Sequence, residues 1–248
     1  MPSHSATVWL IFKREFKAYF RTPLAAIFLL VFLGLVAGLS FFAAGFFDRG
    51  QADLSAFFLW HPWLYMILMP ALGMRLWAEE RRSGTIELLM TLPVQTWQLV
   101  AGKFLAGWAF IGLALVATFP MWVTVNYLGD PDNGVIFASY LGSWLMAGAF
   151  LALAACISAL TKNQVIAFIL ATIAGFLLVM AGYDLVLASV RGWAPDGVVE
   201  LVQSLSFISH FNRLSSGIIE LTTLVFFTSM IALCLWINVH LVDLKKAS

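Results

Sequence analysis

Residues 24–47 read LAAIFLLVFLGLVAGLSFFAAGFF. The stretch has no charged residue, and Ser40 is its one hydroxyl side chain. A helix that crosses a hydrocarbon layer about 30 Å thick needs about 20 mostly apolar residues, since each residue advances about 1.5 Å. This stretch therefore predicts a transmembrane helix.

The rest of the chain repeats this pattern. Apolar residues make up 62% of the 248 residues and charged residues 11%, against about 45–50% and about 25% in soluble domains. We therefore predict one all-α integral membrane domain over residues 1–248 with six transmembrane helices. The predicted spans are residues 24–47, 57–77, 104–127, 135–160, 165–187 and 218–241.

The basic residues predict the orientation. Cytoplasmic loops carry the excess of Lys and Arg, and an even number of spans puts both termini on one side. With the N-terminus inside, eleven basic residues lie in the cytoplasm and three outside, which are Arg49, Arg191 and Arg213. We therefore expect a multi-pass protein of the bacterial cytoplasmic (inner) membrane with both termini cytoplasmic.

Residues 1–22 have an aromatic face and a basic face. Trp9, Phe12 and Phe16 recur at helical spacing, and Lys13, Arg14 and Lys17 lie beside them. This pattern predicts an amphipathic helix in the cytoplasmic headgroup layer, with a break at Pro23. The alternative is that the segment extends the first span as a basic flank.

Two connections are too long to be simple turns. The external one, residues 188–217, predicts one or two short helices at the outer surface before the last span. In the first span, Gly34 and Gly38 form a Gly-x-x-x-Gly pattern that lets helices approach closely. Packing within one subunit explains this pattern more simply than contact between subunits.

The cytoplasmic connection, residues 78–103, carries the most informative motif. Gly84 is expected to break the preceding helix, Thr85 to cap a new one, and Pro93 to end it. Charges beside exposed apolar side chains suit a docking surface for a soluble partner, although an ordinary solvated loop is the alternative. The candidate partner-contacting residues are Glu79, Glu80, Arg81, Gly84, Thr85, Glu87, Leu88, Leu89 and Pro93.

Two motifs carry a family resemblance. The pattern Glu80-Arg81-x-x-Gly84-Thr85-x-Glu87-x-Leu89-x-x-x-Pro93, followed by Gly102-Lys103, resembles the connection after the second span of ABC-2-type permeases. The external-loop motif, with His210, Phe211, Gly217 and Glu220, resembles the gliding-motility-associated branch of that family. The chain departs from that branch at Thr222 and Thr223, where Asp and Arg are often found.

The resemblance implies the function. It implies a non-catalytic permease subunit of an ATP-driven exporter, with residues 85–92 as a coupling helix in a groove of a separate ABC ATPase. It also implies two copies of the permease and two of the ATPase, with ATP and Mg²⁺ on the ATPase. An auxiliary binding subunit is a further possible partner. The resemblance does not specify the substrate.

The chain offers little support for other functions. Position 97, five before Gly102, is Trp, and Phe104 follows Lys103, so the phosphate-binding loop of an ATPase is absent. Neither the four histidines nor Cys156 and Cys234 show metal-ligand spacing. The net charge of +1 disfavours nucleic-acid binding. An intramembrane enzyme and an ion-coupled carrier remain alternatives, although the middle of every predicted span lacks charge.

Overall fold

The computed structural model describes residues 4–85, 94–192 and 194–244, and all regular structure in these ranges is helical. The elements of the first half are α1 (His4–Arg21), α2 (Leu24–Gly38), the π-helical turn η1 (Leu39–Ala43), α3 (Ser55–Phe58), α4 (His61–Gly73), α5 (Ala78–Ser83), α7 (Thr96–Val116) and α8 (Phe119–Leu128). The second half has α9 (Asn133–Ser158), α10 (Gln164–Met180), α11 (Asp184–Arg191), α12 (Asp196–Ser204), α13 (Phe207–Ser215) and α14 (Leu221–Leu244).

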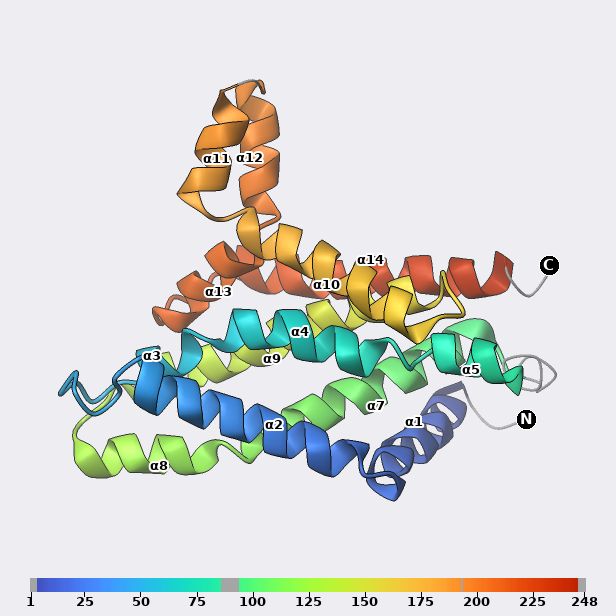
Figure 1. The fold of residues 1–248 in the computed structure, drawn as a ribbon, viewed down its shortest axis with the longest axis horizontal. Helices are drawn as coiled ribbons and strands as arrows, with labels where there is room; N and C mark the ends of the chain where they lie inside the picture. Colours follow the sequence, from blue (N-terminus) through green and yellow to red (C-terminus); the bar gives the residue numbers. More distant parts are fainter. Residues whose placement is uncertain (1–3, 86–93, 193, 245–248) are drawn as a thin grey trace.

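The long helices form one bundle, and the described segments nearest the two chain termini lie at the same end of it (Figure 1). The short helices α11 and α12 project sideways from the bundle as a pair. Helix α9 lies at the centre, in contact with α4, α7, α10, α13 and α14. Its many small residues allow this, because side chains such as Ala147, Ala149 and Ala152 leave room for neighbouring backbones to approach.

Among the described residues, five helical stretches are long and apolar enough to cross a membrane. They are Leu24–Ala43, Ser55–Ser83, Thr96–Leu128, Asn133–Ser158 and Leu221–Leu244. The predicted fifth span, residues 165–187, is shorter than expected, because α10 ends at Met180 and α11 begins only at Asp184. With 17 residues, α10 stands at the lower limit of about 17 for a spanning helix. A crossing of the membrane by α10, and with it a total of six spans, therefore remains a prediction.

Several predicted boundaries change. Helix α7 begins at Thr96 rather than at residue 104, so Lys103 lies inside the helix and not in a flanking loop. The break between α7 and α8 coincides with Pro120, which lies in the first turn of α8, where a proline needs no backbone hydrogen bond. The predicted break at Pro23 is confirmed, because α1 ends at Arg21 and α2 begins at Leu24.

One expectation about the external connection holds, and one about packing is wrong. Two short helices, α12 and α13, lie wholly within residues 188–217, where one or two were predicted, and α11, which begins inside the predicted fifth span, precedes them. The Gly34 and Gly38 pair does not mediate close packing within the described part of the chain, because a Cβ atom built at either position meets nothing within 4 Å. Close approach occurs instead at Gly73 of α4, where a Cβ would lie 2.5 Å from the Cβ of Ala154 in α9.

Candidate functional site

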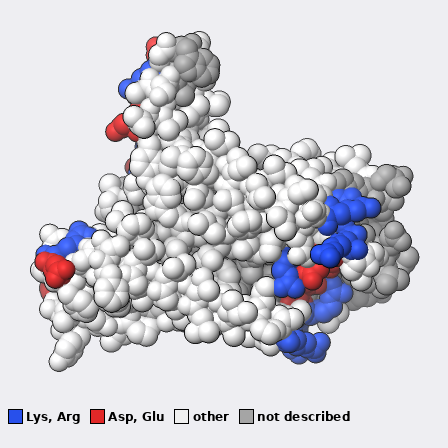
Figure 2. Space-filling model, in the orientation of Figure 1, with Lys and Arg blue, Asp and Glu red and all other residues white. Residues whose placement is uncertain are grey.

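One end of the bundle carries a cluster of charged side chains where α1, α5 and α7 meet. Figure 2 shows Lys and Arg gathered around a few acidic atoms at this end, which is also the end near the chain termini in Figure 1. We call it the charged end and define it by Glu15, Arg75, Glu79, Glu80 and Lys103. Its residues come from segments up to 88 positions apart in the sequence, from position 15 to position 103.

Lys103 is the central cation of the charged end. Its side chain is only 3% exposed, and its Nζ atom lies 2.6 Å from Glu80 Oε1 and 3.4 Å from Glu15 Oε2. The same atom lies 5.5 Å from the centre of the Trp77 ring, a cation–π distance. A buried ammonium group is tolerated when such partners replace its hydration shell. Lys103 therefore ties α7 to α5 and α1 at once.

Glu15 is held ionised at this junction. Burial of the side chain opposes its ionisation, but Lys103 and Arg14 outweigh burial and hold the pKa of Glu15 below its usual range. The Arg14 Nη2 atom donates to Glu15 Oε1 at 2.6 Å. Glu15 is the single acidic residue among the first 47 of the chain, so its place beside Lys103 is a specific feature of α1.

A second set of contacts joins α5 to the end of α9. The buried Ser158 Oγ accepts hydrogen bonds from the backbone nitrogens of Trp77 and Ala78, at 3.2 and 3.0 Å, and donates to the Met74 carbonyl at 2.8 Å. Arg81 Nη1 donates to the Ala159 carbonyl at 2.7 Å. The turn between α4 and α5 is therefore fixed to α9 by both backbone and side-chain groups.

Several of the predicted coupling residues lie in or beside α5. Glu79 accepts two hydrogen bonds from Arg75, at 2.7 and 3.2 Å. Gly84 ends α5 with a φ of +71°, a left-handed conformation that favours glycine, so its predicted role as a helix breaker is confirmed. Thr85 Oγ1 lies 2.9 Å from Ser83 Oγ. The other predicted residues, Glu87, Leu88, Leu89 and Pro93, lie outside the described residues.

The aromatic face predicted for α1 is a continuous row of rings, the aromatic stack, in which the first two pairs are stacked and the last is tilted. Successive rings of Trp9, Phe12, Phe16 and Phe20 have centroids 4.9, 5.6 and 5.3 Å apart. Lys13 and Lys17 are exposed beside this stack, and Arg14 pairs with Glu15. On the other side of the helix, Ile11 is buried in the core, and a Cβ built at Gly102 of α7 would come within 2.6 Å of its Cγ2. Helix α1 is therefore fixed to α7, with its aromatic stack along one side.

The external-loop motif lies elsewhere, where α13 meets α14. The His210 ring stacks on Phe226 with centroids 3.9 Å apart, and its Nε2 atom lies 3.0 Å from the Ser204 carbonyl. Phe211 is buried, and Gly217 adopts a φ of +84°. Glu220 pairs with Arg213 at 2.9 Å. These contacts fix α13 to the start of α14, and in Figure 1 both lie away from α5 and the charged end.

Thr222 and Thr223, the two positions at which the chain differs from the gliding-motility-associated branch, also contact this motif. Thr222 Oγ1 donates to Glu220 Oε2 at 3.1 Å, and Thr223 Oγ1 lies 3.4 Å from His210 Nδ1. Both hydroxyl groups therefore contact residues of the motif.

Three residues of the charged end, Glu15, Arg75 and Lys103, were not among the predicted coupling residues, although Lys103 belongs to the motif that carries the family resemblance. Glu15 and Lys103 had a visible signal: Glu15 is a lone acid in a basic segment, and Lys103 directly precedes a long apolar run. Their pairing depends on how α1 folds back against α7, which spacing along the chain does not reveal. Sequence reasoning also missed Ser158, because a serine near the end of an apolar helix carries no distinctive pattern.

The architecture defines a multi-pass helical membrane protein with a charged end built from three helices. A family model described as ABC-2 family transporter protein matches residues 9–242. The chain belongs to this family, which is consistent with a permease subunit of an ABC transporter. A search of curated proteins gives no match.

Proposed function

We propose that this chain is the membrane-spanning permease subunit of an ATP-driven exporter and that a separate ABC ATPase docks at the charged end. The family match supports the class of protein. The observation that carries the docking site is the set of ion pairs from Lys103 to Glu80 and Glu15. These pairs join α5, which directly precedes the predicted coupling segment 85–92, to α1 and α7.

In this proposal, the contacts of α5 with α7 and α9 transmit a movement of α5 to both of these helices. A partner that displaces the segment after Gly84 also pulls on α5. Through Glu80 and Lys103 that pull reaches α7, and through Arg81 and Ser158 it reaches α9. Buried ion pairs and packed helices move as units rather than deforming smoothly, so a displacement of α5 is passed on to these helices. ATP and Mg²⁺ belong to the ATPase in this proposal.

A dimer of permeases completes the proposal. The Gly34 and Gly38 face of α2 is not packed closely against the described part of the chain. Exposed Ile27, Leu30 and Leu35 lie on the same helix. A second copy of the chain suits such a face, since two copies related by two-fold symmetry present identical surfaces to each other. We therefore propose two permeases with two ATPases, in the bacterial inner membrane, with both termini cytoplasmic.

The assembly can be tested by mass. We expect co-expression with the ABC ATPase encoded nearest to this chain to give a complex with two copies of each protein, measured by native mass spectrometry in detergent or nanodiscs. A monomeric chain that transports without any ATPase or nucleotide would instead support an ion-coupled carrier.

The coupling step can be tested with two matched variants. In Glu80→Gln the carboxylate that pairs with buried Lys103 is lost, whereas in Glu220→Gln the loss affects an exposed pair with Arg213, away from the charged end. We expect Glu80→Gln to keep ATPase binding but to reduce the ATPase stimulation by the permease severalfold, and Glu220→Gln to change it little. Equal stimulation in Glu80→Gln and the unmodified complex would remove this ion pair from the coupling path.

A further inference from the structure

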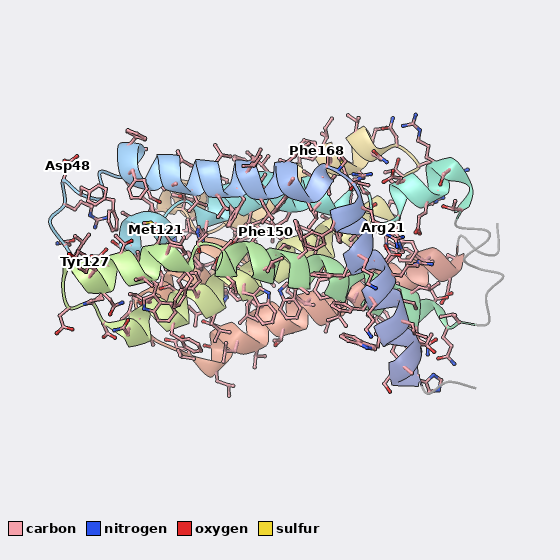
Figure 3. All side chains as sticks on the ribbon, turned by 90° about the horizontal axis from the view of Figure 1, so that it is seen from below. Arg21, Asp48, Met121, Tyr127, Phe150 and Phe168 are labelled. Atoms are coloured by element: carbon pink, nitrogen blue, oxygen red, sulfur yellow. The ribbon has the colours of Figure 1, made fainter. Side chains whose placement is uncertain are left out.

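A groove of about 710 Å³ opens between α1 and the adjoining faces of α7 and α9. Figure 3 shows α1 running obliquely away from Arg21 across the bundle, so that it forms one wall of this region. The wall and floor are lined by Trp9, Phe12, Leu105, Trp108, Ala109 and Trp144. A second hollow of about 400 Å³ continues from Trp144 toward α8.

The floor of the groove presents only hydrocarbon surface. The Trp108 and Trp144 rings stack with centroids 4.1 Å apart. Each indole nitrogen donates to the backbone carbonyl of the other residue, at 2.9 and 3.2 Å. Because both N–H groups are satisfied between the helices, no polar group of this pair is left for a ligand. The floor therefore favours an apolar chain.

The polar groups of the groove lie near its α1 wall. His4 Nδ1 lies 2.9 Å from Gln98 Nε2 there. Lys13 is exposed, and its Nζ atom lies 5.0 Å from the centre of the Trp9 ring, which itself lines the groove. Lys13 is not itself a lining residue, but its contact with Trp9 places an ammonium group at the edge of the groove. A cation beside an apolar floor matches a molecule with an anionic head and a hydrocarbon tail.

We propose that this groove binds one anionic phospholipid from the leaflet next to the charged end. Its acyl chain lies along Trp108 and Trp144, and its phosphate is bound by Lys13. Basic residues at a membrane surface attract anionic lipids, and a tryptophan such as Trp9 of α1 favours the boundary between headgroups and acyl chains. The proposal rests on α1 and the groove alone and does not depend on the ATPase partner or on the dimer.

The headgroup part of the site can be tested by native mass spectrometry of the purified, delipidated protein titrated with phosphatidylglycerol or phosphatidylcholine. We expect phosphatidylglycerol to bind more tightly. Lys13→Gln should weaken its binding about fivefold, the factor that one basic residue contributes at a membrane surface. Lys17→Gln removes the same charge one turn further along α1 and away from Trp9, and it should leave the binding unchanged.

The chain part of the site is tested by filling the groove. Ala109→Phe places a ring among the lining residues, and Ile173→Phe places the same ring on the exposed surface of α10. We expect only Ala109→Phe to abolish retention of phosphatidylglycerol, in a protein that stays monodisperse. Equal binding of both lipids, or an equal loss in Lys13→Gln and Lys17→Gln, would overturn the site. A second copy of the chain that occupies the groove and excludes the lipid would also overturn the site.

Discussion

Lys103 is a buried cation with two carboxylate partners on two other helices. We therefore expect a substitution of Lys103 to lower the free energy of unfolding more than a substitution of the exposed Arg14. Lys103→Met keeps the length of the side chain but leaves Glu15 and Glu80 facing each other without their shared cation. Removal of one partner from a buried ion pair costs about 3–5 kcal/mol. We expect the free energy of unfolding to fall by about 3 kcal/mol, measured by denaturant titration in detergent.

Arg14→Gln is the matched control for this variant. Arg14 also pairs with Glu15, but its side chain is 51% exposed, and exposed pairs contribute about 0–1 kcal/mol. A loss of stability as large as that of Lys103→Met would show that burial does not distinguish the two pairs.

Sequence reasoning at the scale of single residues identified the negative half of the Glu80–Lys103 pair. Glu80 was a candidate because charges beside exposed apolar side chains suit a docking surface, and Gly84 because a helix was expected to end there. Lys103 was placed in the flank of a span, because a lysine normally marks where a span begins. Its burial is possible only because carboxylates from α1 and α5 converge on it, and that convergence is a tertiary property.

Helix α9 is packed most tightly where it crosses α4, and this crossing predicts the effect of adding one methyl group. In Gly73→Ala the new Cβ lies 2.5 Å from the Ala154 Cβ and 3.3 Å from its backbone, so neither neighbour can turn away. Overpacking of this kind costs about 1–3 kcal/mol. We expect a loss of stability in that range, measured as the denaturation midpoint of the purified protein.

Gly34→Ala provides the contrast on α2. Nothing lies within 4 Å of the new Cβ, and alanine favours a helix by about 0.5–1 kcal/mol over glycine. The monomer should therefore keep or gain stability. If the two variants lost stability equally, the tight crossing of α4 and α9 would not be the cause.

At the scale of helices, apolar length identified the positions of the spanning segments but not all their ends. Thr96 to Lys103 was left out of the third span because three polar side chains, Thr96, Gln98 and Lys103, interrupt it. All three are buried in the structure. The fifth predicted span was too long, because it included apolar residues such as Leu185. In the structure α10 ends at Met180, and α11 turns away from the bundle (Figure 1). Apolar composition alone does not distinguish a span from an amphipathic helix that follows it.

For the whole molecule, the distribution of charge along the bundle is the most informative property. Lys and Arg gather at the charged end (Figure 2), and Asp48 lies toward the opposite end (Figure 3). Summing Lys and Arg over loops predicted this asymmetry well, because the rule depends on membrane insertion and not on how side chains pair. The pairing of helices around α9 was beyond such reasoning, since all the spans have similar apolar surfaces.

The orientation in the membrane is the last prediction, and α9 allows a direct test. Its 26 residues extend about 39 Å, so the loops before and after it lie on opposite sides of a bilayer about 30 Å thick. Asp130 and Lys162 are exposed in these two loops, whereas the native Cys156 and Cys234 are buried. In a background without the two native cysteines, we expect an impermeant thiol reagent on intact cells to label Asp130→Cys and not Lys162→Cys. Permeabilised cells should give label at both positions, which serves as the control for reactivity. The reverse pattern in intact cells would place the charged end outside the cytoplasm, where no ATP-dependent partner could dock, and would contradict both the orientation and the proposed coupling.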